Sequence, residues 1–356
     1  MRDSANITTG QTPTAEAATS LWQPINIVQI LFGCVGVIGN AMVCLTISRK
    51  KSLQNLTNRF IASLAITDLI SSALWVLSVF SRRFPPSDNP SVRHFQCVVV
   101  EGGYLFWISI LASTYQLVAI TLERLFAIVY PVRHRIFFSR RWAAVGIAAS
   151  WILPFAVLAN FPIFHKMVDG ACVYIGTQSG ILVHGLFLFC ATYLAPLVTM
   201  TWAYIKIWQS LKIGRSQQGE PGSSHSAPET DHRHRARRKV VQMLLIVFVT
   251  FVVCWTPDQL MVLMHNIGLA TLTMSQFGPV QILALCNSIS NPFIYAFKNK
   301  QYRDGIRELF CFGHSPAQVG VESTTSQREQ THTTAATSTG LHHTVETGLA
   351  TVASST

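Results

Sequence analysis

The sequence predicts an all-α membrane protein, a bundle of seven transmembrane helices with a short amphipathic helix at the membrane surface. Two observations predict this fold class. Hydrophobic residues make up 49% of the 356 residues and charged residues only 12%, whereas a soluble domain carries about 25% charged residues. The charges crowd into short runs, and the apolar stretches between them reach the roughly 20 residues that a helix needs to cross a bilayer.

Seven apolar stretches have the length and the lack of charge that membrane-spanning helices require. They are too long and too poor in charge for the amphipathic helices of a soluble bundle, which is the other class of fold that such segments could form. The expected spans are 24–48, 59–80, 98–129, 142–161, 180–208, 240–266 and 275–297.

The segment after the last span, "KNKQYRDGIRELFCF", has a different pattern. Its apolar residues Tyr302, Ile306 and Leu309 alternate with basic residues, which is typical of a helix lying on a membrane surface. The chain beyond it is rich in Ser and Thr and poor in apolar residues, so we expect disorder there. The expected parts are an N-terminal segment (1–23), the seven-span domain (24–297), the surface helix (298–311) and the tail (312–356).

The positions of Lys and Arg predict the orientation. The face that holds the N-terminus carries five of the 27 Lys and Arg residues, and the opposite face carries the other 22. The positive-inside rule makes that opposite face cytoplasmic, so we expect a multi-pass cell-membrane protein with an extracellular N-terminus and a cytoplasmic C-terminus. The net charge of +11 then faces anionic membrane lipid, and nucleic acid is not an expected partner. The sequon at Asn6 lies on the outer side, where it can be glycosylated.

Several polar residues fall inside the expected spans. Asp68 lies midway along the second span, where an ionisable side chain is costly and is a functional candidate by default. For each Asn or Ser taken alone, the alternative is a structural hydrogen bond between helices. These residues are Asn40 in the first span, Ser113 in the third, and Asn287, Ser288 and Asn291 in the seventh.

Short motifs recur in a fixed order across all seven spans. They are Gly39-Asn40, "LAITDL" (64–69), "ERLFAIVYP" (123–131), Trp151, Pro196 with Tyr204, "FVVCWTP" (251–257) and "NPFIY" (291–295). In order, spacing and position within the spans, this set resembles the rhodopsin-like (class A) G-protein-coupled receptors. The resemblance implies a receptor, not an enzyme. Such a receptor binds an extracellular ligand and activates heterotrimeric G-proteins by outward movement of its cytoplasmic helix ends.

The resemblance assigns the intramembrane polar residues to an allosteric sodium site. Pro292 removes a backbone donor and frees a carbonyl, and freed backbone groups at membrane depth need polar partners. We expect the polar side chains of the seventh span to provide them and, with Asp68, to form an oxygen-rich pocket. The expected sodium-site residues are Asp68, Ser113, Asn287, Ser288 and Asn291.

The end of the third span matches the G-protein switch of the family. Glu123 keeps a carboxylate next to the Arg124 guanidinium, which holds the arginine in the resting state. Many members have a second, acidic restraint at the base of the sixth span, where Arg237 stands here. The other residues that the resemblance implies are the switch tyrosines Tyr204 and Tyr295 and a transmission core of Thr114, Pro196 and Phe251, with Thr114 in place of the usual Ile or Val.

Further expectations concern the two faces of the membrane. The resemblance implies a disulfide between Cys97 and Cys172 on the oxidising outer side. The stretch from Cys97 to Arg124 is longer than usual in the family, which indicates an insertion at the outer end of the third span. On the inner side, Cys311 is a palmitoylation candidate. Phosphorylation of the tail by receptor kinases would add negative charge and recruit arrestin, although a merely solvated tail fits the sequence equally well.

The outer ends of the spans limit the class of ligand. Leu285 stands where light receptors carry the retinal lysine, and Phe106 stands where biogenic-amine receptors carry an Asp. Asp258 is the candidate ion of the pocket, and a carboxylate at that depth requires a cationic partner. We expect a neuropeptide ligand, and the alternatives are a small-molecule amine or a metabolite. The expected ligand-binding residues are Phe106, Trp107, Trp255, Asp258 and Gln259.

Other classes of membrane protein fit less well. A transporter or channel is built from repeats with paired broken helices, and no internal repeat is visible. A membrane enzyme would need a catalytic pair, but Asp68 and Asp258 lie at different depths. A receptor fold that does not couple to G-proteins is the third alternative, and the intact Arg124 and "NPFIY" motif argue against it.

Overall fold

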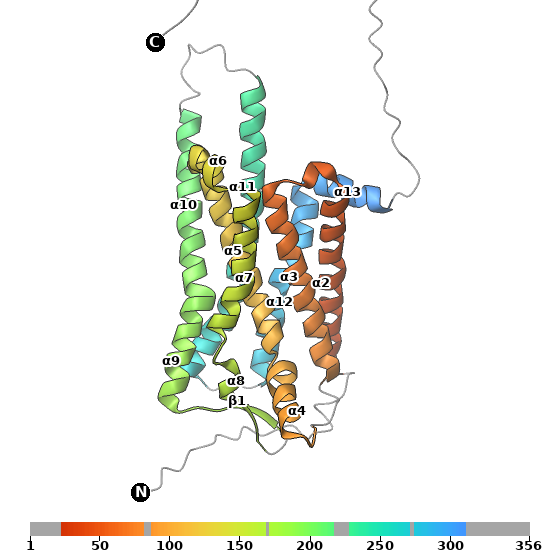
Figure 1. The fold of residues 1–356 in the computed structure, drawn as a ribbon, viewed down its shortest axis with the longest axis vertical. Helices are drawn as coiled ribbons and strands as arrows, with labels where there is room; N and C mark the ends of the chain where they lie inside the picture. The colour runs from red at the N-terminus through yellow and green to blue at the C-terminus, as the bar shows by residue number, and fades with distance from the viewer. Residues whose placement is uncertain (1–22, 82–86, 169–170, 217–227, 271–273, 311–356) are drawn as a thin grey trace, which may run out of the picture. The chain divides into compact units, whose positions relative to one another are not determined.

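The structure, a computed structural model of the chain, describes residues 23–81, 87–168, 171–216, 228–270 and 274–310. Seven helical segments within these residues are long and apolar enough to cross a membrane, which confirms the expected seven-span fold. One end of the bundle carries α6 (Pro131–Phe137) and α13 (Lys300–Phe310), and the other carries α4 (Pro90–Phe95) and β1 (His165–Val168) (Figure 1). We call these the α13 end and the hairpin end.

Four spans are single helices and three are composite. The single helices are α2 (Pro24–Arg49), α3 (Leu56–Ser81), α11 (Pro228–Asn266) and α12 (Met274–Lys298), with the short turn η1 (Lys51–Leu53) after α2. The third span joins α4 through a π-helical turn, η2 (Gln96–Glu101), to α5 (Tyr104–Val129). The fourth joins α7 (Arg140–Val157) to α8 (Phe161–Phe164), and the fifth joins α9 (Gln178–Phe189) through a second π-helical turn, η3 (Cys190–Leu194), to α10 (Ala195–Ser216).

The third span departs from a regular α-helix at the hairpin end, as its extra length leads us to expect. The π-helical turn η2 takes up additional residues, and Gly103 follows it with a φ of 70°, a left-handed conformation that favours glycine. Cys97 in η2 forms the expected disulfide with Cys172. Cys172 lies in β2 (Ala171–Tyr174), which pairs antiparallel with β1. The disulfide therefore fastens this hairpin to the third span.

The short helix α13 docks on the bundle through close contacts as well as an amphipathic sequence. It lies within the range 298–311, where a surface helix is expected. Tyr302 is fully buried beside Tyr295 of α12, and a Cβ at Gly305 would lie only 2.5 Å from Thr46 of α2. An ion pair of 2.9 Å between Lys50 and Glu308 adds to this contact.

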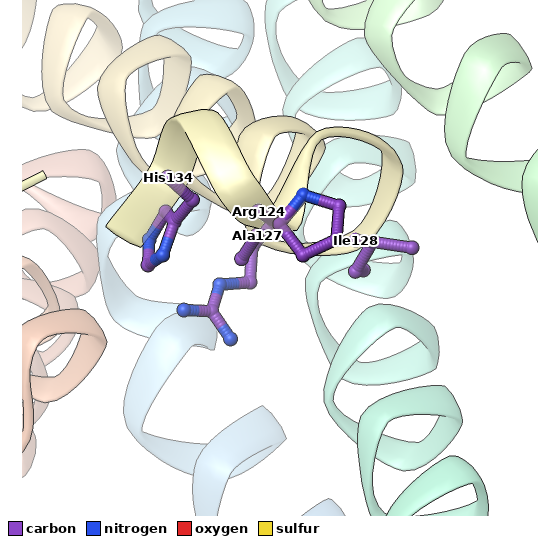
Figure 2. A pocket seen from close by; sticks show the side chains of 5 residues that line it. Arg124, Ala127, Ile128 and His134 are labelled. Carbon is purple, nitrogen blue, oxygen red and sulfur yellow. The ribbon is translucent and has the colours of Figure 1, made fainter. Parts of the chain in front are cut away.

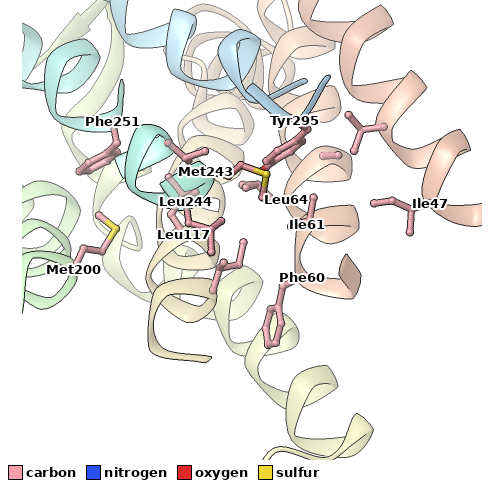
Figure 3. Packing of buried hydrophobic residues seen from close by; sticks show 14 of the residues in the cluster. Ile47, Phe60, Ile61, Leu64, Leu117, Met200, Met243, Leu244, Phe251 and Tyr295 are labelled. Carbon is pink, nitrogen blue, oxygen red and sulfur yellow. The ribbon is translucent and has the colours of Figure 1, made fainter. Parts of the chain in front are cut away.

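The largest group of buried hydrophobic side chains draws on all seven spans and on α13. Leu117 of α5, Met200 of α10, Phe251 of α11 and Tyr295 of α12 belong to it (Figure 3). Helices in lipid gain little from hydrophobic burial against one another, so their association depends on close packing.

Small residues allow such packing between α2 and α3, and this contact can be tested. A Cβ at Gly36 would lie 2.9 Å from the Cβ of Ser72. We predict that Gly36→Ala lowers the melting temperature of the detergent-solubilised protein, because the methyl group pushes α2 from α3 at a cost of about 1–3 kcal/mol. Gly146→Ala is the control, since its Cβ would meet Phe60 at an ordinary 3.5 Å. Equal melting temperatures for Gly36→Ala and the unaltered protein would contradict the close packing of α2 against α3.

Candidate functional site

A buried carboxylate joins three helices at the centre of the bundle. Asp68 of α3 is 0% exposed, and its Oδ1 accepts a hydrogen bond from Ser113 Oγ of α5 at 2.7 Å. Its Oδ2 accepts one from Asn291 Nδ2 of α12 at 2.8 Å. The structure thus joins three of the five expected sodium-site residues, Asp68, Ser113 and Asn291, whereas the Ser288 hydroxyl has no hydrogen-bond partner among the described residues. A carboxylate at this depth needs such partners.

Asn40 connects the first span to the same group. Pro292 has no N–H, so the carbonyl of Ser288, four residues earlier, lacks its helical donor. Asn40 Nδ2 donates to this carbonyl at 3.2 Å and also to Gly36 O at 3.0 Å. We expect seventh-span side chains to satisfy the freed carbonyl, but an amide of the first span does so. The proline therefore creates a contact between α2 and α12.

The oxygens around Asp68 fit the sodium ion that the resemblance implies. The Oδ1 atoms of Asn40, Asn287 and Asn291 are buried and have no hydrogen-bond partner among the described residues. Asn291 also donates a hydrogen bond to Asp68, so Asp68, Ser113 and Asn291 bring carboxylate, hydroxyl and amide oxygens together, the ligand type that hard cations take. A bound sodium ion would offset the negative charge of Asp68.

A second buried carboxylate lies at the α13 end. Glu123 is 0% exposed and contacts Arg124 with both oxygens, Oε2 at 2.5 Å from Nε and Oε1 at 2.5 Å from Nη2. Thr57 of α3 donates to Glu123 Oε2 at 3.3 Å and accepts a hydrogen bond from Arg124. His134 Nε2 of α6 lies 2.9 Å from Glu123 Oε1. Thr57 and His134 are members of this group that sequence analysis misses.

A cavity of about 240 Å³ adjoins the charged group. Figure 2 shows the Arg124 and His134 side chains projecting toward the same open space. The cavity is lined by Arg124, Ala127, Ile128, Pro131 and His134. The guanidinium therefore has room to move if Glu123 releases it.

The two expected switch tyrosines have different neighbours. Tyr204 of α10 packs on Phe248 of α11, with ring centroids 5.2 Å apart, and Tyr295 of α12 lies 5.6 Å from Tyr302. The Tyr295 hydroxyl is buried and has no hydrogen-bond partner among the described residues. An unpaired buried hydroxyl is unfavourable, so Tyr295 would gain from a partner in a second arrangement of the helices.

The expected transmission core lies between the fifth and sixth spans and α5. Its members Thr114, Pro196 and Phe251 are all buried. Thr114 Oγ1 donates to Ile110 O at 3.3 Å within its own helix, so the hydroxyl that replaces the usual Ile or Val is satisfied locally. Sequence analysis misses Tyr193, whose hydroxyl lies 2.5 Å from Thr256 Oγ1 and links the fifth and sixth spans.

Aromatic side chains surround a small cavity toward the hairpin end. The expected ligand residues Phe106, Trp107 and Trp255 line it together with Trp75, which sequence analysis misses. Trp75 and Phe106 are in contact, with ring centroids 5.0 Å apart. The cavity measures about 10 Å³, about the space that one water occupies. A ligand that enters it must therefore displace the rings.

Asp258 and Gln259 lie one turn beyond Trp255 and outside this aromatic lining. Asp258 is 1% exposed, and its Oδ2 accepts a hydrogen bond from Gln259 Nε2 at 3.2 Å. Gln259 Oε1 accepts one in turn from Thr192 Oγ1 at 3.3 Å. Asp258 Oδ1 has no hydrogen-bond partner among the described residues. The expected ligand residues thus form an aromatic group and a polar group.

Several expected features lie outside the described residues. These are the glycosylation residue Asn6, the palmitoylation residue Cys311 and the Ser and Thr residues of the tail. The side chain of Arg237 is not described either.

Comparison with known proteins establishes the class. The family described as "7 transmembrane receptor (rhodopsin family)" matches residues 39–295. The chain therefore belongs to the rhodopsin family of seven-transmembrane receptors, which confirms the resemblance seen in the motifs.

Individual relatives match this chain over most of its length. Neuropeptide Y receptor type 2 of Homo sapiens is 29% identical over 305 residues, which cover 80% of this chain and 77% of the relative. The receptor of the same name from Bos taurus is 28% identical, with 80% and 76% covered. The allatostatin-A receptor of Bombyx mori is 27% identical, with 80% of each chain covered.

The oxygen set around Asp68 leads to a measurable effect of sodium. We predict that sodium chloride raises the melting temperature of the purified receptor relative to choline chloride at equal ionic strength, and that Asp68→Asn removes the difference. The amide has the shape of the carboxylate but lacks the charge that attracts a cation. Asp258→Asn makes the same change at another buried aspartate and should keep the sodium effect. Sodium stabilisation that survives Asp68→Asn would place the cation elsewhere.

Proposed function

We propose that this chain is a cell-surface receptor for an extracellular peptide and that it activates heterotrimeric G-proteins when the helix ends at the α13 end move outward. The observation that carries the ligand class is Asp258, a buried carboxylate with one oxygen unpaired among the described residues. A buried carboxylate without a cation is unfavourable. A ligand that presents an Arg or Lys side chain, or an amino terminus, would supply this partner.

The separation of two groups of ligand residues favours a peptide. A peptide can place a cation at Asp258 and an apolar side chain in the aromatic group of Phe106, Trp107 and Trp255 at the same time. The relatives are named as receptors for neuropeptide Y and allatostatin-A, which supports the same ligand class. The alternative ligand is a small-molecule amine or metabolite, which would need only Asp258.

The coupling half of the proposal rests on the α13 end. Arg124 is held by Glu123 beside a cavity of about 240 Å³, an arrangement that permits a held and a released guanidinium. A ligand that favours the released arrangement would shift the population toward it. In this proposal Tyr204 and Tyr295 come together, and Thr114, Pro196 and Phe251 relay the change from the ligand pocket.

The proposal includes an orientation in the cell membrane. The hairpin end and segment 1–23, with glycosylated Asn6, lie outside, and the seven-span domain covers 24–297. The surface helix (298–311), with palmitoylated Cys311, and the tail (312–356) lie in the cytoplasm, where receptor kinases and arrestin act on the tail. Exposed basic side chains near the α13 end, Lys51, Arg238 and Lys239 among them, support contact with anionic lipid.

Asp258 provides the test of the ligand class. We predict that a peptide agonist, found by screening a peptide library on expressing cells, loses at least about 30-fold in potency on Asp258→Asn, because breaking a buried charge pair costs about 2–5 kcal/mol. Asp88→Asn removes a charge from an exposed residue at the same end and should leave potency within a few-fold. Activation by amines or metabolites alone would favour the alternative ligand.

Glu123 provides the test of the switch. We predict that Glu123→Gln raises agonist-independent GTPγS loading of co-expressed G-proteins several-fold, because a neutral amide cannot hold the guanidinium with two charge-assisted hydrogen bonds. Glu308→Gln is the matched control, since its ion pair with Lys50 lies at the surface and contributes little. Loading that is no higher in Glu123→Gln than in Glu308→Gln would contradict the restraint on Arg124.

A further inference from the structure

We propose that His134 is a proton-dependent positioning residue of the switch. In this proposal, protonation of its ring loosens the hold of Glu123 on Arg124, so that G-protein activation rises as the cytosol becomes more acidic. The inference rests on the G-protein coupling proposed above and adds a control of that coupling from the short helix α6.

The first observation is that two nitrogen groups share one carboxylate oxygen. Glu123 Oε1 lies 2.5 Å from Arg124 Nη2 and 2.9 Å from His134 Nε2. Arg124 belongs to the third span, whereas His134 belongs to α6, which follows that span. Any change in the charge of the imidazole therefore acts directly on the carboxylate that holds the guanidinium.

The second observation is the difference in exposure within this group. The Glu123 side chain is 0% exposed, the Arg124 side chain 19% and the His134 side chain 24%. A proton can reach His134 from the solvent, while the carboxylate that it affects is shielded from water. Charges interact more strongly where water is excluded, so the added proton has a large local effect.

The other charged side chains near His134 are basic, so Glu123 is the acid that pairs with it. Exposed Arg133 and Arg135 flank it on α6, and Arg59 on α3 is exposed. Phe138 stacks on the ring with centroids 5.0 Å apart. Arg140 and Arg141 at the start of α7 are also exposed. Among the described residues of α3, α5, α6 and α7 at this end, Glu123 is the only carboxylate.

The direction of the effect follows from linkage. While Arg124 is held, a protonated His134 puts a second cation on the same oxygen, and the two cations repel each other. Once Arg124 leaves, Glu123 is free to pair with the imidazolium alone, so a proton binds more tightly in the released arrangement. By reciprocity, the proton favours that arrangement. The imidazole is the side chain whose charge ordinarily changes between about pH 5 and pH 8.

The third observation is the cavity beside Arg124 and His134. Arg124 and His134 both line this space of about 240 Å³, and their side chains project toward it in Figure 2. A guanidinium released by Glu123 can therefore move without first displacing packed side chains. The same space lets solvent protons reach the imidazole.

The experiment measures agonist-independent GTPγS loading by purified receptor and G-protein between pH 7.5 and pH 6. We expect the rate for the unaltered receptor to rise roughly fivefold, the lower end of the usual range for coupled sites. His134→Gln keeps a hydrogen-bond donor but cannot become charged, so its rate should not follow pH. His134→Arg carries a permanent charge and should show a raised rate at every pH.

A second histidine controls for pH effects on the G-protein itself. His165 is also partly buried, but it lies in β1 at the hairpin end, and burial lowers its pKa. His165→Gln should keep the pH response of the unaltered receptor. A response that persists in His134→Gln, or loading that ignores pH in the unaltered receptor, would overturn the role of His134 alone. No loading at any pH by the unaltered receptor or by His134→Arg would overturn this inference, and no loading with a peptide agonist either would overturn the proposed coupling as well.

Discussion

A carboxylate removed from water must find its partners inside the protein, and this constraint organises the bundle at three levels. Asp258 lies toward the hairpin end, Asp68 at the centre and Glu123 at the α13 end, and each is at most 1% exposed. The cost of burying a charge is several kcal/mol unless it is paired. Asp68 meets this condition only because α5 and α12 bring Ser113 and Asn291 to it. The positions of these helices are therefore tied to one another.

The three carboxylates differ in how completely they are paired, and this difference gives each level its role. Asp68 has a hydrogen bond on each oxygen, from Ser113 and Asn291, and the Asn291 amide oxygen is buried without a partner among the described residues, which suits a cation. Glu123 has partners from α3, α5 and α6, so it is crowded and sensitive to any change among them. Asp258 has one oxygen without a partner among the described residues. In the proposed function, the ligand cation pairs with Asp258, where pairing is incomplete, and the G-protein switch responds at Glu123, where several partners crowd one carboxylate.

A backbone constraint reinforces the centre of the bundle. Pro292 leaves the Ser288 carbonyl without its helical donor, and Asn40 supplies the missing hydrogen bond from α2. Lipid offers no substitute, because the hydrocarbon core has no hydrogen-bonding groups. The hydrogen bond that is missing within α12 is therefore replaced by one between α2 and α12. The polar side chains of the segment 284–297 make other contacts: Asn291 donates to Asp68 of α3, and Ser290 donates to the Cys286 carbonyl of its own helix.

The sequence by itself determined the seven spans, because apolar stretches of roughly 20 residues are stable mainly across a membrane. It also determined the importance of Asp68, since an ionisable residue in such a stretch is costly wherever it points. Only the tertiary structure decided the partners. Thr57 lies 66 residues from Glu123, and Tyr193 lies 63 residues from Thr256, so no local pattern marks either pair. His134 stands in a short basic run that reads as a charged surface, and only the docking of α6 on α5 places its ring against a buried carboxylate. A hydrogen bond between distant residues depends on helix packing, which the periodicity of one helix does not contain.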